Sequence, residues 1–349
     1  MRIDGNIGGS IDGTAGANLG ELRSQVELAD HIGYDGVWST EVARDPFLPL
    51  LLAAEHSPRL QVGTAIAVAF ARNPMTLATV ANDLQSFASG RLLLGLGSQI
   101  KPHIERRFSM PWSEPASRMR EFVCALRAIW ESWQTDTPLD FRGDFYTHTL
   151  MTPMFRPPHN EFGSPAVLIA AVGKRMTSVA AEVADGIQVH GFTTERYLRE
   201  VTVPLLREGR EAAGKSLDDF IVSYPGLVVT GSEEQQFEAA TAAVRRQIAF
   251  YGSTPAYRAV LDLHGWDDLH TELNRLSKLG DWSTMSALID DTVLHTFAVV
   301  GEPADVAAEI ARRFEGVVSR FTLYTPYPLD TAAQQTVVEG IRDRRVTAS

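Results

Sequence analysis

Polar side chains crowd into one stretch of the chain, residues 98–107, which directly follows the apolar run 92–96. The apolar run is typical of a strand buried on both faces, and it ends at Gly97. The polar residues are Ser98, Gln99, Lys101, His103, Glu105, Arg106 and Arg107. Of these, Lys101, His103 and Glu105 are candidates for exchanging a proton with a substrate. Loops that follow buried parallel strands carry the chemistry of α/β proteins, so we expect this loop to hold part of an active site.

A second polar motif, Gly173-Lys174-Arg175, stands where a predicted strand becomes a predicted helix. Free backbone N–H groups at a helix start bind phosphate, and neighbouring cations add to the attraction. Thr193 and Thr194 follow the next predicted strand and offer hydroxyl donors to the same group. This pattern predicts a phosphate site, and an ordinary solvated helix start is the competing interpretation.

Two further residues stand at the ends of predicted strands. Glu41 follows residues 36–39 and is placed to act as an acid/base or to anchor a ring nitrogen, unless it only caps a helix. His190 ends the strand at 186–190, where it has either a cofactor-binding or a structural role. His103 and Glu105 are two residues apart and do not share a helix face, so we predict no metal site.

Eight apolar segments of strand length alternate with helical patterns along the chain. They are residues 3–7, 36–39, 61–68, 92–96, 166–172, 186–190, 220–229 and 320–324. Eight is the strand count of a (β/α)₈ TIM barrel, in which all the strands end at one face. The alternation loosens after the fourth and the seventh strand. We therefore predict one domain, residues 1–349, with insertions at about 108–165 and 233–296.

Composition and missing motifs exclude several classes of protein. The net charge of -11 argues against nucleic acid or an anionic membrane as the main partner. Cys124 is the only cysteine, which rules out disulfides within the chain and cysteine metal clusters. The start of the chain does not look like a signal peptide and no apolar run has membrane-spanning length, so we expect a soluble cytoplasmic protein.

The glycines at the end of the fourth predicted strand do not form a dinucleotide-binding motif. Gly95 and Gly97 have the right spacing, but Ile100 stands where the third glycine belongs. They are either places where a flat ligand approaches the backbone or sites of tight strand packing. The chain also contains no G-x-S-x-G turn, phosphate-binding loop of nucleotide hydrolases or C-x-x-C motif, so simple hydrolase and kinase functions have no support.

Five segments together resemble the bacterial luciferase-like monooxygenase superfamily, and in particular its branch that uses the deazaflavin coenzyme F420. They are GYDGVWSTE, VGTAIAVAFARNP, GRLLLGLGSQIKPHIERRF, PAVLIAAVGKRM and AVVGEPADVAAEIARRF. The resemblance spans about residues 33–327. It implies a luciferase-like barrel with the coenzyme ring at the carboxyl ends of the strands. It also implies a bulge with a non-prolyl cis peptide at Ala65-Ile66, whose backbone supports the ring.

The same resemblance implies roles for individual residues. Glu41 occupies the position of an acidic residue near the ring, and Ser98 and Gln99 line the coenzyme. Gly173 and Lys174 hold its phosphate. To this cofactor set we add the neighbouring residues Gly97, Lys101, Arg175, His190 and Thr193.

Two departures from the resemblance affect catalysis. Val42 stands where related dehydrogenases have a histidine, and Ile100 stands where the sugar-phosphate enzymes have a glutamate. We therefore do not transfer those substrates. We predict His103 as the acid/base, with Glu41 fixing the ring.

The sequence leads to one principal functional hypothesis and two alternatives. The first is an F420-dependent oxidoreductase that transfers a hydride between C5 of the coenzyme and a small organic substrate. The second is a monooxygenase that uses reduced FMN and oxygen. The third is a coenzyme-binding protein without turnover. The resemblance further implies a homodimer or larger homo-oligomer. The aromatic residues of the insertions indicate either an apolar or aromatic substrate or ordinary core packing.

Overall fold

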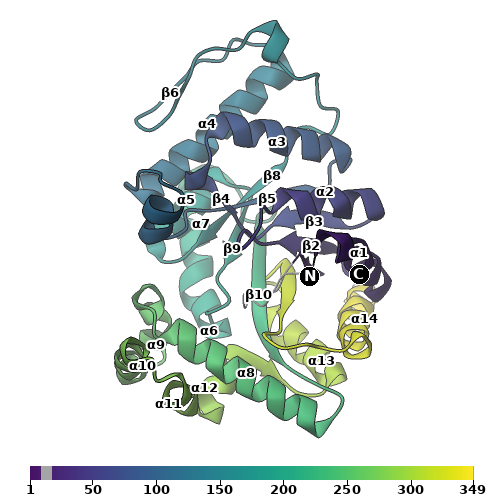
Figure 1. The fold of residues 1–349 in the computed structure, drawn as a ribbon, viewed down its shortest axis with the longest axis vertical. Helices are drawn as coiled ribbons and strands as arrows, with labels where there is room; N and C mark the ends of the chain where they lie inside the picture. The colour runs from purple at the N-terminus through teal and green to yellow at the C-terminus, as the bar shows by residue number, and fades with distance from the viewer. Residues whose placement is uncertain (9–17, 349) are drawn as a thin grey trace.

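Eight parallel strand positions close into a barrel in the computed structural model, which describes residues 1–8 and 18–348 (Figure 1). Neighbouring strands follow the chain around the barrel, and β10 pairs with both β9 and β12 to close it. The barrel strands are β1 (Arg2–Ile7), β2 (Gly36–Ser39), β3 (Gln61–Thr64) with β4 (Ala67–Val68), β5 (Leu92–Gly97), β8 (Ala166–Ala171), β9 (Gly186–Val189), β10 (Ile221–Val229) and β12 (Arg320–Tyr324). The predicted (β/α)₈ barrel is confirmed.

Amphipathic helices surround the barrel because each must bury one apolar face against the strands. In α13 the buried residues Val306, Ile310 and Phe314 recur at helical spacing on one face. The surrounding helices are α1 (Leu22–Ile32), α2 (Phe47–His56), α3 (Pro74–Phe87), α4 (Pro115–Thr135), α5 (Lys174–Val183), α6 (Glu195–Tyr197), α7 (Val203–Ala212), α13 (Pro303–Phe314) and α14 (Thr331–Ala348). Within the described residues no helix is long and apolar enough to cross a membrane.

A buried ion pair links the first and last barrel strands. The carboxylate of Asp4 accepts hydrogen bonds from Arg320 Nη2 at 2.7 Å and Arg320 Nε at 2.8 Å. It also accepts one from Trp38 Nε1 at 3.0 Å. Both charged side chains are almost fully buried, so each depends on the other for its stabilisation. Gly36 leaves room for this pair, because a Cβ there would lie 2.7 Å from Arg320 Nη2.

The third strand was predicted as one continuous segment, residues 61–68, but the structure shows two shorter strands. It is divided into β3 and β4 by a cis peptide between Ala65 and Ile66, as the resemblance implied. Backbone hydrogen bonds attach this bulge to the end of β2. Ala65 N–H donates to Ser39 O at 2.8 Å, and Ile66 O accepts from Glu41 N–H at 3.2 Å. The bulge therefore lies beside Glu41.

The two irregular regions of the sequence add structure to the strand–helix repeat. In the first, α4 packs between α3 and α5 as a barrel helix, and the additions after it are the hairpin of β6 (Phe141–Arg142) and β7 (Thr147–His148), and η4 (Pro153–Phe155). The second contains α8 (Glu234–Gly252), η6 (Pro255–Tyr257), α9 (Arg258–Leu263), α10 (Asp267–Leu279), α11 (Trp282–Ala287) and α12 (Asp291–Phe297). These helices share a separate apolar cluster. After α12, β11 (Ala298–Val300) pairs with the end of β10, a strand that the sequence pattern did not reveal.

Candidate active site

Five neighbouring positions in the barrel end in predicted site residues. β2, the β3–β4 strand, β5, β8 and β9 are adjacent in that order. Their carboxyl ends lead into Glu41, Ile66, Gln99, Gly173 and His190, respectively. Because parallel strands end at the same face of a barrel, these residues form a continuous arc. The arc joins parts of the chain that are far apart in the sequence.

Glu41 is held by the bulge and by an arginine. Its Oε2 accepts hydrogen bonds from Val68 N–H at 2.7 Å and from Arg72 Nη1 at 2.6 Å, and its side chain is only 7% exposed. Arg72 also pairs with Asp45 at 2.8 Å. The helix that follows, α2, begins at Phe47, and the Phe47 N–H donates to Asp45 Oδ1 at 2.8 Å, so Asp45 and not Glu41 is the carboxylate at this helix start. Its carboxylate connects β2 to β4.

The glycines of β5 are packed against protein atoms. A Cβ on Gly95 would lie 2.0 Å from Thr64 O, and one on Gly97 would lie 2.7 Å from Ile66 Cδ1. For Gly95 the tight-packing interpretation is therefore correct, and approach of a flat ligand is not, because the barrel interior is filled there. Gly97 brings Ile66 of the bulge close to the end of β5. Ser98 and Gln99 follow, half-buried, with Gln99 in the left-handed region at φ 59°.

The polar stretch after β5 forms a short helical segment, η3 (His103–Arg107). His103 is exposed, and Lys101 lies 3.8 Å from the carboxylate of Glu105, forming an exposed ion pair. Arg107 Nη2 donates to Val42 O at 2.5 Å, which connects η3 to the loop after β2. The candidate acid/base thus lies on the surface, beside the arc.

The start of α5 has the properties of an anion site. Gly173 has φ 76° and precedes the helix, and no side chain caps the first turn. A Cβ at Gly173 would have no described atom within 4 Å. Lys174 and Arg175 are exposed beside it. Uncapped N–H groups with two cations attract a phosphate, so this geometry fits the predicted coenzyme tail.

The two threonines after β9 are buried rather than directed to solvent. Thr194 caps α6, because its Oγ1 accepts from Tyr197 N–H at 3.1 Å and lies 2.9 Å from His264 Nε2. Thr193 is 3% exposed, and its Oγ1 has no hydrogen-bond partner among the described residues. Thr194 is thus engaged in local structure, while the hydroxyl of Thr193 retains its capacity to bond.

His190 is half-buried at the end of β9 and is enclosed by aromatic rings. Its ring stacks on that of Tyr257, with ring centroids 4.2 Å apart. It also meets the ring of Tyr251 edge-on, with ring centroids 4.7 Å apart. Loss of hydration lowers its pKa to about 4. Its Nδ1 accepts from Phe192 N–H at 3.0 Å, which assigns the ring proton to Nε2. At neutral pH His190 therefore offers an N–H donor and carries no charge.

The aromatic partners of His190 are not evident from the sequence. Tyr251 ends α8 and Tyr257 belongs to η6, so both come from the second insertion. The hydroxyl of Tyr251 lies 2.9 Å from that of Tyr324 at the end of β12. The sequence shows that this insertion contains aromatic residues, but it does not show which of their rings reach the barrel.

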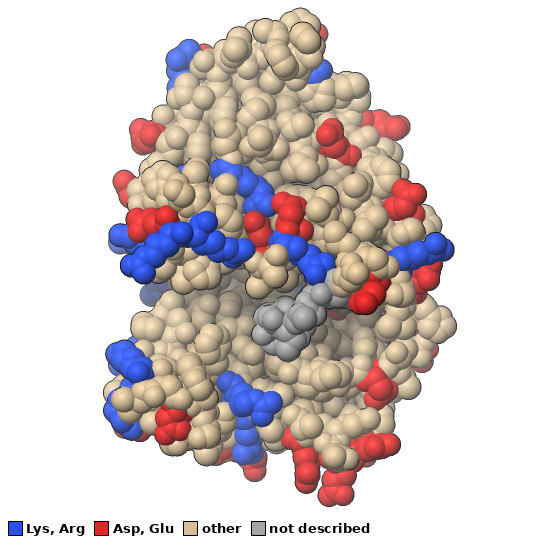
Figure 2. All heavy atoms as spheres, viewed as in Figure 1, with Lys and Arg blue, Asp and Glu red and all other residues tan. Residues whose placement is uncertain are grey.

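One face of the molecule is hollowed across its middle (Figure 2). Lys and Arg side chains gather along the upper edge of this hollow, with Asp and Glu between them. α8 runs along the lower edge (Figures 1 and 2).

In the part of the chain that the structure describes, no group of three His, Cys, Asp or Glu residues could hold a metal ion.

Comparison with known proteins agrees with this architecture. A family model described as luciferase-like monooxygenase matches residues 6–320. The uncharacterized protein Rv1360 of Mycobacterium tuberculosis (strain ATCC 25618 / H37Rv) is 52% identical over 340 residues, which cover 97% of this chain and 96% of the relative. The 5,10-methylenetetrahydromethanopterin reductase of Archaeoglobus fulgidus is 26% identical over 314 residues, which cover 88% of this chain and 90% of the relative.

Two solved structures share the fold over nearly the whole chain. The coenzyme F420 dependent tetrahydromethanopterin reductase from Methanopyrus kandleri has a TM-score of 0.79 and 19% identity, covering 98% of this chain and 99% of its own. EDTA monooxygenase from Chelativorans sp. BNC1 has a TM-score of 0.76 and 14% identity, covering 99% and 94%. The family model spans most of the barrel, including every strand of the arc. The chain therefore belongs to the luciferase-like monooxygenase family.

Proposed function

We propose that this chain is an F420-dependent oxidoreductase that transfers a hydride between C5 of the deazaflavin and a small organic substrate. The observation that carries the proposal is the arc of strand ends, which runs from Glu41 through the bulge to the start of α5. Family membership and the reductase relatives support an oxidoreductase. When bound, the coenzyme supplies the hydride chemistry, and the protein orients it and excludes water.

In this proposal the start of α5 binds the acidic tail of the coenzyme. The uncapped N–H groups after Gly173 donate hydrogen bonds to the phosphate, while Lys174 and Arg175 add positive charge. Lys101 on the neighbouring loop adds to the attraction, and Thr193 offers its free hydroxyl from the loop after β9.

The ring is assigned to the surface between the bulge and the end of β5. Ala65 and Ile66 form its backing, and Gly97 and Ser98 begin the loop that borders it. Glu41 acts here as a positioning residue, because its Oε2 bonds to the β4 backbone and to Arg72. Gln99 lies at the edge of the same surface.

Two histidines are candidates for proton transfer, and we propose His103 as the acid/base. Its imidazole is exposed to solvent beside the arc, and imidazole is a common proton-transfer group in enzymes. His190 instead donates a hydrogen bond from Nε2 as a neutral group, which positions a ligand without moving a proton. We expect His103→Ala to lower kcat and alter its pH profile, whereas His190→Phe should mainly raise KM. An unchanged kcat in His103→Ala would contradict the assignment.

Coenzyme binding gives the direct test. Purified protein is titrated with F420 and with FMN while fluorescence is followed, and tighter binding of F420 is expected. Lys174→Gln should weaken F420 binding by about tenfold, since it removes one charge-assisted contact to an anion. Lys278→Gln is the matched control, because Lys278 is an exposed lysine in the last turn of α10. Tighter binding of FMN, or an equal effect of both variants, contradicts the proposal.

An FMN-dependent monooxygenase is the second candidate, because EDTA monooxygenase shares this barrel closely. Oxygen consumption with reduced FMN and a test substrate distinguishes this activity from hydride transfer to or from F420. Binding of F420 without turnover of any substrate would instead favour a coenzyme carrier.

A further inference from the structure

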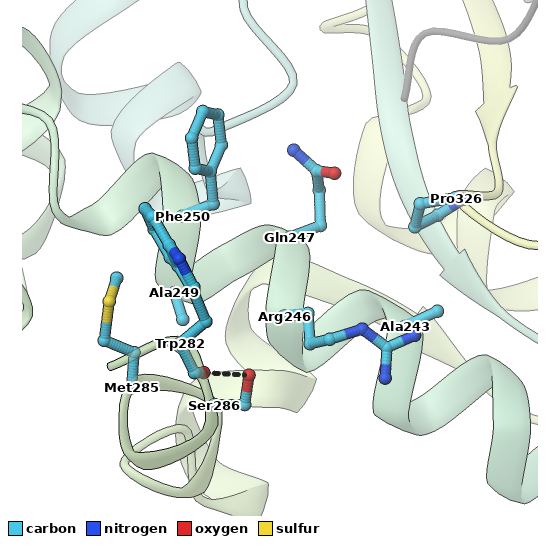
Figure 3. A pocket seen from close by; sticks show the side chains of 9 residues that line it. All are labelled: Ala243, Arg246, Gln247, Ala249, Phe250, Trp282, Met285, Ser286 and Pro326. Atoms are coloured by element: carbon cyan, nitrogen blue, oxygen red, sulfur yellow. Dashed lines mark hydrogen bonds between the residues drawn. The ribbon is translucent and has the colours of Figure 1, made fainter. Parts of the chain in front are cut away.

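A pocket of about 350 Å³ lies between α8, α11 and the loop after β12 (Figure 3). Phe250 and Trp282 form one wall, Pro326 stands opposite, and Arg246 and Gln247 lie on α8 between them. This volume falls in the range of small-molecule sites, which combine apolar walls with few polar groups. None of the individually predicted site residues lines this pocket, but all of its lining residues except Pro326 belong to the insertion predicted at about residues 233–296.

Arg246 is the only cation among the nine described residues that line the pocket. It is exposed and makes no hydrogen bond or ion pair with residues 1–8 or 18–348. The helix positions that flank it on its own face are Ala242, Ala243, Ala249 and Phe250, so α8 provides no carboxylate there. On a chain of net charge -11, this unpaired guanidinium favours a ligand with a single negative charge.

The aromatic wall is exposed although its side chains are large and apolar. Phe250 is 50% exposed and Trp282 is 51% exposed, and their ring centroids lie 6.2 Å apart. Figure 3 shows the two rings close together at one side of the pocket. A planar apolar group placed against them would bury area on both, and aromatic contacts of this kind are favourable.

The pocket is connected to the ring cluster around His190. Phe250 lines the pocket and packs against Tyr251, with ring centroids 5.6 Å apart. The ring of Tyr251 in turn meets that of His190, with centroids 4.7 Å apart. A ligand in the pocket is therefore one layer of aromatic side chains away from the end of β9.

We propose that this pocket binds a small aromatic monocarboxylate, with the ring against Phe250 and Trp282 and the carboxylate on Arg246. The planar guanidinium fork matches a carboxylate with two parallel hydrogen bonds. Its further assignment as the recognition site of the substrate rests on the proposed oxidoreductase function. Binding itself requires no coenzyme, so the two can be tested separately.

The test is calorimetric titration of the full chain, without coenzyme, with 2-naphthoate and with uncharged 2-naphthamide. The carboxylate should bind about tenfold more tightly than the amide. Arg246→Gln should abolish this preference, and Trp282→Leu should weaken both ligands. Arg207→Gln is the matched control, since Arg207 is exposed on α7 away from the pocket and should leave both affinities unchanged.

Equal binding of acid and amide, or a preference that survives in Arg246→Gln, overturns the pocket assignment. If the protein binds the carboxylate selectively through Arg246 but does not bind F420, the ligand assignment of the pocket is supported. Its role in an F420-dependent reaction is then overturned. The two failures are thus distinguishable.

Discussion

The buried environment of His190 predicts a pH dependence of stability. In the folded protein its pKa is lowered to about 4, whereas an unfolded histidine has a pKa of about 6.5. Between these values the unfolded chain binds more protons than the folded chain, so stability falls as the pH decreases. The contribution of His190 is complete above pH 6.5 and is lost progressively down to about pH 4.

The magnitude follows from the difference in proton binding. From pH 7 to pH 5 the unfolded histidine takes up a proton over about 1.5 pH units, at about 1.4 kcal/mol per unit. His190 alone therefore lowers the free energy of unfolding by about 2 kcal/mol over this interval. His190→Phe keeps an aromatic ring beside Tyr257 but cannot be protonated.

The assay is urea denaturation of wild type and variant at pH 7 and pH 5. The loss of unfolding free energy between the two pH values should be about 2 kcal/mol smaller in His190→Phe, whatever the variant does to absolute stability. His159→Gln, at an exposed position, serves as control and should retain the wild-type difference. An equal pH-dependent loss in wild type and His190→Phe would refute the reasoning.

The remaining predictions concern packing inside the barrel. Asp4→Asn should cost about 3–5 kcal/mol of unfolding free energy in urea denaturation, because it leaves Arg320 buried without its counter-charge. Arg142→Gln breaks an exposed ion pair and should cost less than about 1 kcal/mol of unfolding free energy. Similar losses in Asp4→Asn and Arg142→Gln would show that burial does not strengthen the dependence on the ion pair. Gly95→Ala should lower the melting temperature by several degrees, since its methyl group would collide with Thr64 O. A Gly95→Ala protein as stable as wild type would show that the strands can separate there.

Much of the barrel was predictable because its evidence is local. Each strand is a short apolar run and each helix repeats its apolar residues at helical spacing, as residues 92–96 and 303–314 illustrate. β11 was missed because three residues directly after a helix carry no readable period. The break of the third strand came from the resemblance, since Ala65 and Ile66 are ordinary strand residues in the sequence.

The candidate site was predictable only in part. Residue types identified Glu41, Lys174 and His190 as groups at strand ends, because chemistry at those positions is visible in order along the chain. What each group contacts depends on residues far away in sequence. Glu41 proved to bond Arg72, and His190 to lie among tyrosines of the second insertion.

By itself the sequence determined the strand–helix order, the family and the strand ends at which polar residues gather, because periodicity and residue type are local properties. The tertiary structure decided which of these groups are exposed, which are held by partners and which share a surface. Arg246 illustrates the difference: in the sequence it is one arginine of a helix, and only the packing of α8 against α11 makes it the one cation among the described residues that line a pocket. Burial and charge pairing arise from contacts across the fold, so they appear only when the chain is closed into its barrel.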